Sequence, residues 1–245
     1  MDCATPMDTR IAYLLLVHDD PPMAVRLCSQ LLRDPSADIY LHVDKKSSLC
    51  FSGCISLDSA RVHAVDERYV VSWAGFNMVL ATLSLPRPAL AAPHNYSYLV
   101  LLSGHDYPLR SPTEINRYFH EAHYRQHINR ISILDSPDFY AAHITRYHFR
   151  DQWIRPRLLD KILRRLATSL MLPLRRRLQT SVMPCHGSQW WALTANCAEY
   201  LLAAIDADPD FSRPYRHSFV PDEHFFHTLV QNSPYVVEAP PHHAV

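Results

Sequence analysis

Short apolar segments alternate with amphipathic ones in this chain, and that alternation restricts the possible folds more than any other feature. The apolar segments read as buried strands over residues 11–17, 38–44, 61–65 and 96–102. The amphipathic segments predict helices over 21–32, over 73–85 and from Ser111 onward. Strands and helices that alternate in this way predict an α/β fold: a mainly parallel sheet with helices on both faces.

Composition excludes several classes of protein. The chain has 245 residues, 48% of them hydrophobic, and a formal net charge of zero, so we expect a globular protein that does not bind nucleic acid. Its six cysteines form no paired motif, and no apolar run approaches the roughly 18 residues of a membrane span. The amino terminus shows no signal-peptide pattern. These features predict a cytoplasmic protein, either free or peripheral to the membrane.

Polar residues gather where the expected strands end. The first strand runs into "HDD" (18–20), the second into "DKK" (44–46) and the fourth into "SGHDYPLR" (103–110). In open parallel sheets, ligands bind outside the carboxyl ends of the strands. The sequence therefore predicts one polar pocket along that edge of the sheet.

An ordered set of motifs covers roughly residues 10 to 235: "LLLVHDD", "IYLHVDKKS", "VSWAGFNMVLATL", "YLVLLSGHDYPLRSPTEI", "GSQWWALT" and "FVPDEHFFHTLV". This set resembles the core-2/I-branching family of β-1,6-N-acetylglucosaminyltransferases and the related peptide O-xylosyltransferases. The resemblance implies one domain over 1–245 with a GT-A-like, nucleotide-diphospho-sugar transferase fold. It also implies an inverting transfer from UDP-GlcNAc or UDP-xylose to a glycan or glycolipid acceptor, without a bound metal or other cofactor.

The same resemblance assigns the nucleotide site to Val17, His18 and Asp44. Asp44 has suitable chemistry, because a carboxylate at a strand end accepts hydrogen bonds from uracil or ribose. The alternative is that Asp44 is only a turn residue before "KKSS".

The acceptor side is assigned to Asp106, Arg110, Trp190 and Trp191. Asp106 has an alternative role, which is to cap the turn around Gly104. The two tryptophans enter a strand side by side, so one faces the core and the other is available to stack on a sugar. Which of the two is exposed does not follow from the sequence.

The segment "PDEHFFHTLV" begins with Pro221, Asp222 and Glu223, and it reads as the start of a helix. By resemblance, Glu223 is the general base that deprotonates the acceptor hydroxyl. Asp222 is assigned either to capping the helix or to orienting the acceptor. We expect the positive end of the helix to keep a carboxylate ionised here.

Two other classes of protein stay open. A metal-dependent hydrolase would use His18, Asp19, His105 and Asp106. A sugar-binding protein without turnover would bind the donor but release no UDP. The "DADPD" segment (206–210) has the spacing of a manganese-binding motif, but it follows an expected helix and so favours a solvated loop.

Residues 155–180 are rich in arginine and leucine and predict a basic amphipathic helix that is interrupted near Pro173. Its apolar stripe either packs on the sheet or contacts an anionic membrane, in which case the three arginines of residues 175–177 are candidate lipid contacts.

The family continues well beyond the PDE motif, and its distal part supplies the cations that hold the donor diphosphate, whereas this chain ends at Val245. We therefore expect either an inactive chain that lacks the family's C-terminal part or a substitute cation, for which Arg110, Arg146 and Arg150 are candidates.

Overall fold

The computed structural model describes residues 9–47, 60–122, 124–136, 138–151, 156–176 and 182–238. The chain forms two compact units. The first, called the sheet unit, comprises Met1–Arg68, Thr82–His127 and Trp190–Glu199. The second, called the PDE unit, comprises Tyr69–Ala81, Ile128–Gln189 and Tyr200–Val245. The expectation of one domain over 1–245 stays a prediction.

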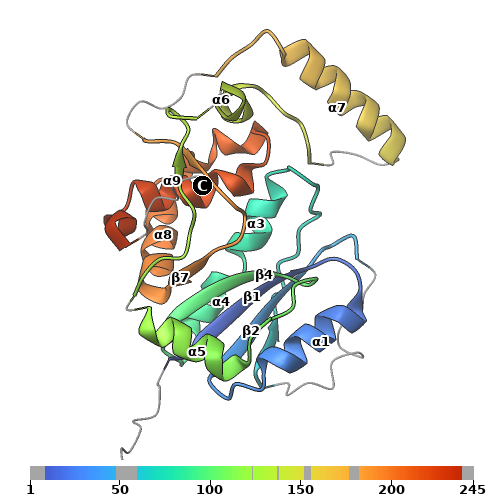
Figure 1. Cartoon of the computed structure of the whole chain (residues 1–245). Helices are drawn as coiled ribbons and strands as arrows, with labels where there is room; N and C mark the ends of the chain where they lie inside the picture. The colour runs from blue at the N-terminus through green and yellow to red at the C-terminus, as the bar shows by residue number, and fades with distance from the viewer. Residues whose placement is uncertain are drawn as a thin grey trace, which may run out of the picture. The chain divides into compact units, whose positions relative to one another are not determined.

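The sheet unit is built on five strands in the order β3-β2-β1-β4-β7 (Figure 1). Their bounds are β1 Ile11–Val17, β2 Ala37–Val43, β3 Val62–Ala64, β4 Tyr98–Ser103 and β7 Ala192–Thr194. The first four strands are parallel to their neighbours, and β7 runs antiparallel to β4. The predicted strands and the mainly parallel sheet are therefore confirmed.

Helices cover both faces of this sheet. Ile11, Tyr13, Leu15 and Val17 of β1 belong to a buried cluster with apolar residues of α1 (Pro21–Leu31) and α5 (Pro112–Glu121). Since successive strand residues point to opposite faces, the intervening β1 residues face the other side, and they are buried as well. Helix α4 (Pro86–Ala91) lies on that side in Figure 1. The predicted fold class is thus confirmed on both faces.

Local sequence explains where the two covering helices begin. The Asp20 carboxylate accepts from the backbone N–H of Met23 and so caps α1, which then starts with Pro21. At α5, Ser111 and Glu114 form the predicted capping box, with the Ser111 hydroxyl accepting from the N–H of Glu114 and the Glu114 carboxylate accepting from the N–H of Ser111.

The PDE unit contains a small antiparallel pair, β5 (Ile131–Ser132) with β6 (Cys185–His186), and mostly helical connections. Its α-helices include α6 Asp138–Thr145, α7 Arg157–Met171 and α9 Phe225–Gln231. Its 3-10 helices are η1 Pro209–Ser212, η2 Tyr215–His217, η3 Pro221–Glu223 and η4 Pro234–Glu238. Two further helices extend across the unit boundaries in the sequence, α3 Asn77–Leu83 and α8 Ala195–Ala207.

Three of the six cysteines, Cys28, Cys185 and Cys197, are buried free thiols, whereas Cys3, Cys50 and Cys54 lie outside the described residues. Within the described ranges, no helix is both long enough and apolar enough to cross a bilayer.

Candidate functional site

The carboxyl ends of β1 and β2 bring together two of the three residues assigned to the nucleotide. Val17 and Val43 are register partners, and the backbone N–H of Asp44 donates to the carbonyl of Val17 at 2.8 Å. The guanidinium of Arg68 then donates to the carbonyls of Val43 and Asp44, both at 2.8 Å. This edge is therefore held by hydrogen bonds that leave little freedom to the backbone.

Asp44 is buried, with 4% of its surface exposed. Its Oδ1 accepts from the N–H of Lys46 at 2.8 Å, and its Oδ2 lies 3.5 Å from the Lys46 ammonium. The alternative role as a turn residue is thus observed. A carboxylate has further acceptor capacity beyond these two contacts, so nucleotide binding by Asp44 stays a prediction.

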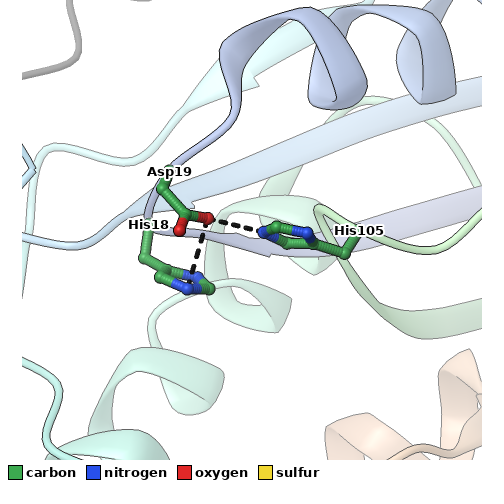
Figure 2. A group of neighbouring side chains, drawn as sticks. All are labelled: His18, Asp19 and His105. Atoms are coloured by element: carbon green, nitrogen blue, oxygen red, sulfur yellow. Dashed lines mark hydrogen bonds and ion pairs between the residues drawn. The ribbon is translucent and has the colours of Figure 1, made fainter.

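Three side chains meet just beyond β1 and β4, as Figure 2 shows. The Asp19 carboxylate lies 2.5 Å from Nε2 of His105 and 3.2 Å from Nε2 of His18. The hydrogen bond from His105 lowers the pKa of Asp19. All three side chains are exposed, and one potential ligand atom from each lies within 4.8 Å of the others. Polar side chains therefore gather at this edge, whereas a single pocket stays a prediction, and the donor set of the cluster also suits a divalent transition metal.

Asp106 does not join that cluster. Its Oδ2 accepts from the N–H of Ser103 at 2.8 Å, while its own N–H donates to the Ser103 carbonyl, so Asp106 closes the turn after β4. Arg110 is exposed and lies 3.8 Å from Glu114. The capping role of Asp106 is thus observed, and acceptor binding by either residue stays a prediction.

The two adjacent tryptophans differ in the way that strand alternation requires. Trp191 is buried, with 4% of its surface exposed, and its carbonyl accepts from the N–H of Leu101. Trp190 is 38% exposed. Of the two, Trp190 is therefore the more exposed indole, a distinction that the sequence left open.

The PDE motif is not the first turn of an α-helix, so that expectation is wrong. Pro221, Asp222 and Glu223 form the separate 3-10 turn η3, and α9 begins only at Phe225. Val220, just before this turn, has a left-handed backbone with φ of 42°. Neither η3 nor α9 has a side-chain cap, so the proposed capping role of Asp222 is also wrong.

Burial, rather than a helix dipole, dominates the electrostatics of both carboxyl groups. Burial raises the pKa of Glu223, which is half-buried. Burial, and to a smaller extent the neighbouring Glu223, raise the pKa of Asp222 to about 7. The expected effect of the helix end, which would lower both values, is therefore outweighed. The Oδ1 atom of Asp222 has no hydrogen-bond partner among the described residues.

Histidines from distant segments surround this turn, and sequence reasoning missed their grouping. Nε2 of His224 lies 3.4 Å from Nδ1 of His143, and the rings of His186 and Tyr140 stack at 3.6 Å. Burial is the main reason that the pKa values of His224 and His227 fall to about 3, so both are neutral at pH 7. No local pattern signals this cluster, because His143 and His186 come from other elements of the unit.

Gly187 fixes the backbone beside the motif. Its N–H donates to the carbonyl of Glu223 at 2.9 Å. A Cβ at this position would collide with the carbonyl oxygen of Asn129 and with the ring of His227. The glycine of "GSQWW" is therefore required by close packing against the PDE segment.

An arginine lies over aromatic rings in the same unit. The guanidinium of Arg150 is 4.8 Å from the ring centroid of Phe219 and 5.6 Å from that of Trp73. Trp73 is 71% exposed, so this indole is not part of the core. The "DADPD" segment begins in the last turn of α8 and continues into η1, with Asp206 and Asp208 both exposed, which agrees with a solvated segment.

The family model described as "Branch: Core-2/I-Branching enzyme" matches residues 11–240, which include every strand of the sheet and the PDE turn. The chain belongs to this family. Two rat proteins illustrate the relationship: xylosyltransferase 2 is 27% identical over 92% of this chain, and xylosyltransferase 1 is 23% identical over 94%. The chain spans about a quarter of the length of these core-2/I-branching relatives, 25% and 27% respectively.

Among solved structures, this family member is similar to a 4-diphosphocytidyl-2C-methyl-D-erythritol synthase from Anaerococcus prevotii, with a TM-score of 0.39 and 9% identity. The match covers 80% of this chain and 78% of that one. A similarity this weak supports no functional conclusion.

The raised pKa of Asp222 predicts an unusual dependence of stability on pH. An unfolded aspartate has a pKa near 3.9, so between about pH 4 and pH 7 the folded state binds the proton more tightly and stability falls as pH rises. Asp222→Asn removes this charge. We therefore compare the free energy of unfolding of Asp222→Asn with that of the unmodified protein in denaturant titrations. The difference in favour of the variant should be larger at pH 8 than at pH 5 by roughly 2 kcal/mol.

The matched control is Asp210→Asn, which alters an exposed aspartate of η1 and should change stability equally at both pH values. A gain for Asp222→Asn that does not depend on pH would show that Asp222 is not buried as an ionisable group.

Proposed function

We propose that this core-2/I-branching protein is an inverting glycosyltransferase that moves GlcNAc or xylose from UDP to the hydroxyl of a glycan or glycolipid acceptor. Family membership over residues 11–240 is the observation that carries this proposal. The names of the similar rat proteins support testing xylose as a donor sugar alongside GlcNAc.

Glu223 is proposed as the general base. An inverting transfer needs one base that removes the acceptor proton while the oxygen attacks the anomeric carbon, opposite the departing UDP. Burial makes Glu223 more basic than an ordinary glutamate, and partial exposure leaves room for a substrate to approach it. Asp222 is the less suitable base, because its pKa near 7 keeps about half of it protonated at neutral pH.

Asp222 fits the second task, which is to orient the acceptor. Its Oδ1 lacks a partner among the described residues but is buried, so a substrate hydroxyl would reach it only after the side chains around the turn move. In the sheet unit, Val17, His18 and Asp44 are proposed to hold the nucleotide, with Asp106, Arg110 and Trp190 on the acceptor side. Trp191 is too deeply buried for direct contact with a sugar, so its proposed role is to support the backbone beside Trp190.

The leaving diphosphate needs positive charge nearby. Of the three candidate arginines, Arg150 is supported best, because aromatic rings hold its guanidinium and it belongs to the same unit as Glu223. Arg110 already lies beside Glu114, and no contact among the described residues orients the Arg146 side chain.

Replacing Glu223 with glutamine keeps the shape of the side chain and removes its basicity. We expect turnover in a UDP-release assay to fall by about 10² to 10⁴, with little change in donor affinity by calorimetry. In the unmodified protein, kcat/KM should decrease as the pH is lowered. The midpoint of this decrease should lie above the ordinary glutamate pKa near 4.3. Near-full turnover by a folded Glu223→Gln protein would move the base to Asp222 or Asp106.

We also propose that transfer needs no metal. The UDP-release assay over a donor panel should give the same rate with and without EDTA. Loss of activity in EDTA and recovery with manganese would overturn this proposal. In that case Asp19→Asn and His105→Ala should be compared with Asp206→Asn and Asp208→Asn, since these two groups are the candidate metal ligands.

The second candidate function is metal-dependent hydrolysis, which the meeting of His18, Asp19 and His105 favours. Stoichiometric zinc or manganese in the purified protein, with hydrolysis that is lost in His105→Ala but retained in Glu223→Gln, would support it over the transferase. Donor binding without UDP release or hydrolysis would instead leave a non-catalytic sugar-binding protein.

A further inference from the structure

Helix α7 (Arg157–Met171), labelled in Figure 1, contacts the rest of the PDE unit through its polar side. Asp160 is its one buried residue, with 1% of its surface exposed. The Nε of Arg164 donates to Asp160 at 2.7 Å, and another nitrogen of the same guanidinium donates to the carbonyl of Arg150 at 2.7 Å. The hydrogen bond from Arg164 to the Arg150 carbonyl therefore places the side of the helix that carries Asp160 and Arg164 toward the rest of the PDE unit.

The apolar side of α7 consequently points to solvent. Leu158, Leu166 and Leu170 are exposed by 72%, 55% and 75% of their surface. Residues four apart lie on the same face of a helix, so Leu158, Ile162, Leu166 and Leu170 form one stripe. Leu159 and Leu163 widen it, and both are also exposed. No described residue of the PDE unit covers this stripe, and packing of the stripe on the sheet, one of the two alternatives from the sequence, stays a prediction.

Cations border the stripe. Arg157, Lys161 and Arg165 follow one another at the same spacing and are all exposed. The helix has one acid, Asp160, which is buried in the pair with Arg164. Just after the helix, Leu172 and Leu174 are again more than half exposed. The outward surface therefore combines apolar and positive side chains with no carboxylate from the helix itself.

We propose that α7 docks this protein on an anionic lipid bilayer, lying parallel to the membrane plane with its leucine stripe among the acyl chains. Fifteen residues at about 1.5 Å each are too short to span the roughly 30 Å hydrocarbon core, but they suit an interfacial helix. The charge pattern favours lipid over a protein partner, because anionic headgroups lie beside an apolar interior at any bilayer surface.

Arg176, the middle one of the three arginines that the sequence singled out, makes contacts within the protein. Arg176 donates to the carbonyls of Arg146, His217 and Pro214, and its guanidinium lies over the ring of Tyr147. It therefore holds the fold together. Arg175 is exposed and stays a candidate, whereas Arg177 lies outside the described residues. The informative cations are Arg157, Lys161 and Arg165.

The test is flotation of the whole protein with vesicles of phosphatidylcholine that contain 30% phosphatidylglycerol or none. Two variants remove the two components of binding: Leu166→Gln with Leu170→Gln, and Arg157→Gln with Lys161→Gln and Arg165→Gln. The matched controls are Leu109→Gln, at a position 97% exposed in the sheet unit, and Arg26→Gln with Arg33→Gln and Arg117→Gln, three exposed arginines outside α7. Thermal unfolding checks that the two α7 variants and the two control variants are folded.

We expect the unmodified protein and both controls to float with anionic vesicles and to be released by added salt. The leucine variant should bind anionic vesicles at least about tenfold less than the unmodified protein at every salt concentration. At low salt, the cation variant should bind anionic vesicles about tenfold less than the unmodified protein, or less still. It should therefore no longer prefer vesicles that contain phosphatidylglycerol.

Binding of both α7 variants that equals that of the controls would overturn the proposal. So would a dimer in light scattering that dissociates in the leucine variant, since a second copy would then cover the stripe. Because flotation requires no sugar transfer, this test is independent of the proposed enzymatic function.

Discussion

Strand β1 is the constraint on which the sheet unit depends. It is hydrogen-bonded to β2 on one side and β4 on the other, and every residue from Ile11 to Val17 is buried. A segment enclosed on four sides accepts only apolar side chains, so polar residues can follow only where the strand leaves the sheet. That is why His18 and Asp19 come directly after Val17 and meet His105 from the neighbouring strand.

The PDE unit places its polar groups by a different principle. Here the carboxyl groups and histidines are not at a solvated strand end but in a tight turn packed among aromatic and imidazole rings. Burial shifts the protonation equilibrium of each side chain toward its neutral form. It therefore raises the pKa values of Asp222 and Glu223 and lowers those of His224 and His227. A base of raised pKa accepts a proton more readily, which is the property that an inverting transfer needs.

The sequence predicted the features that depend on neighbours along the chain. The strands follow from their apolar runs, and the Ser111 capping box follows from a spacing of three residues. What could not be predicted depends on contacts between distant segments: the histidines around His224, the arginine over Phe219 and the separation of the PDE turn from α9. The direction of the carboxyl pKa shifts was wrong for the same reason, since burial is a property of packing and not of local sequence.

Helix α7 has polar contacts to the PDE unit on one side and an exposed apolar stripe on the other. Turning its leucines toward the protein would bury apolar surface worth about 1.5 to 3 kcal/mol for each side chain. The same rotation would keep the Asp160–Arg164 pair, because both residues belong to α7, but it would take Arg164 away from the backbone carbonyls of Phe149 and Arg150. Hydrogen bonds to a charged group are worth about 1.5 to 3 kcal/mol each, so losing these two would cost less than burying the whole stripe would gain. The polar contacts are made within one chain, whereas an apolar surface outside the protein can satisfy the leucines. An orientation with the charges inward and the leucines outward is therefore the one in which both sets of side chains find partners, provided that a bilayer is present.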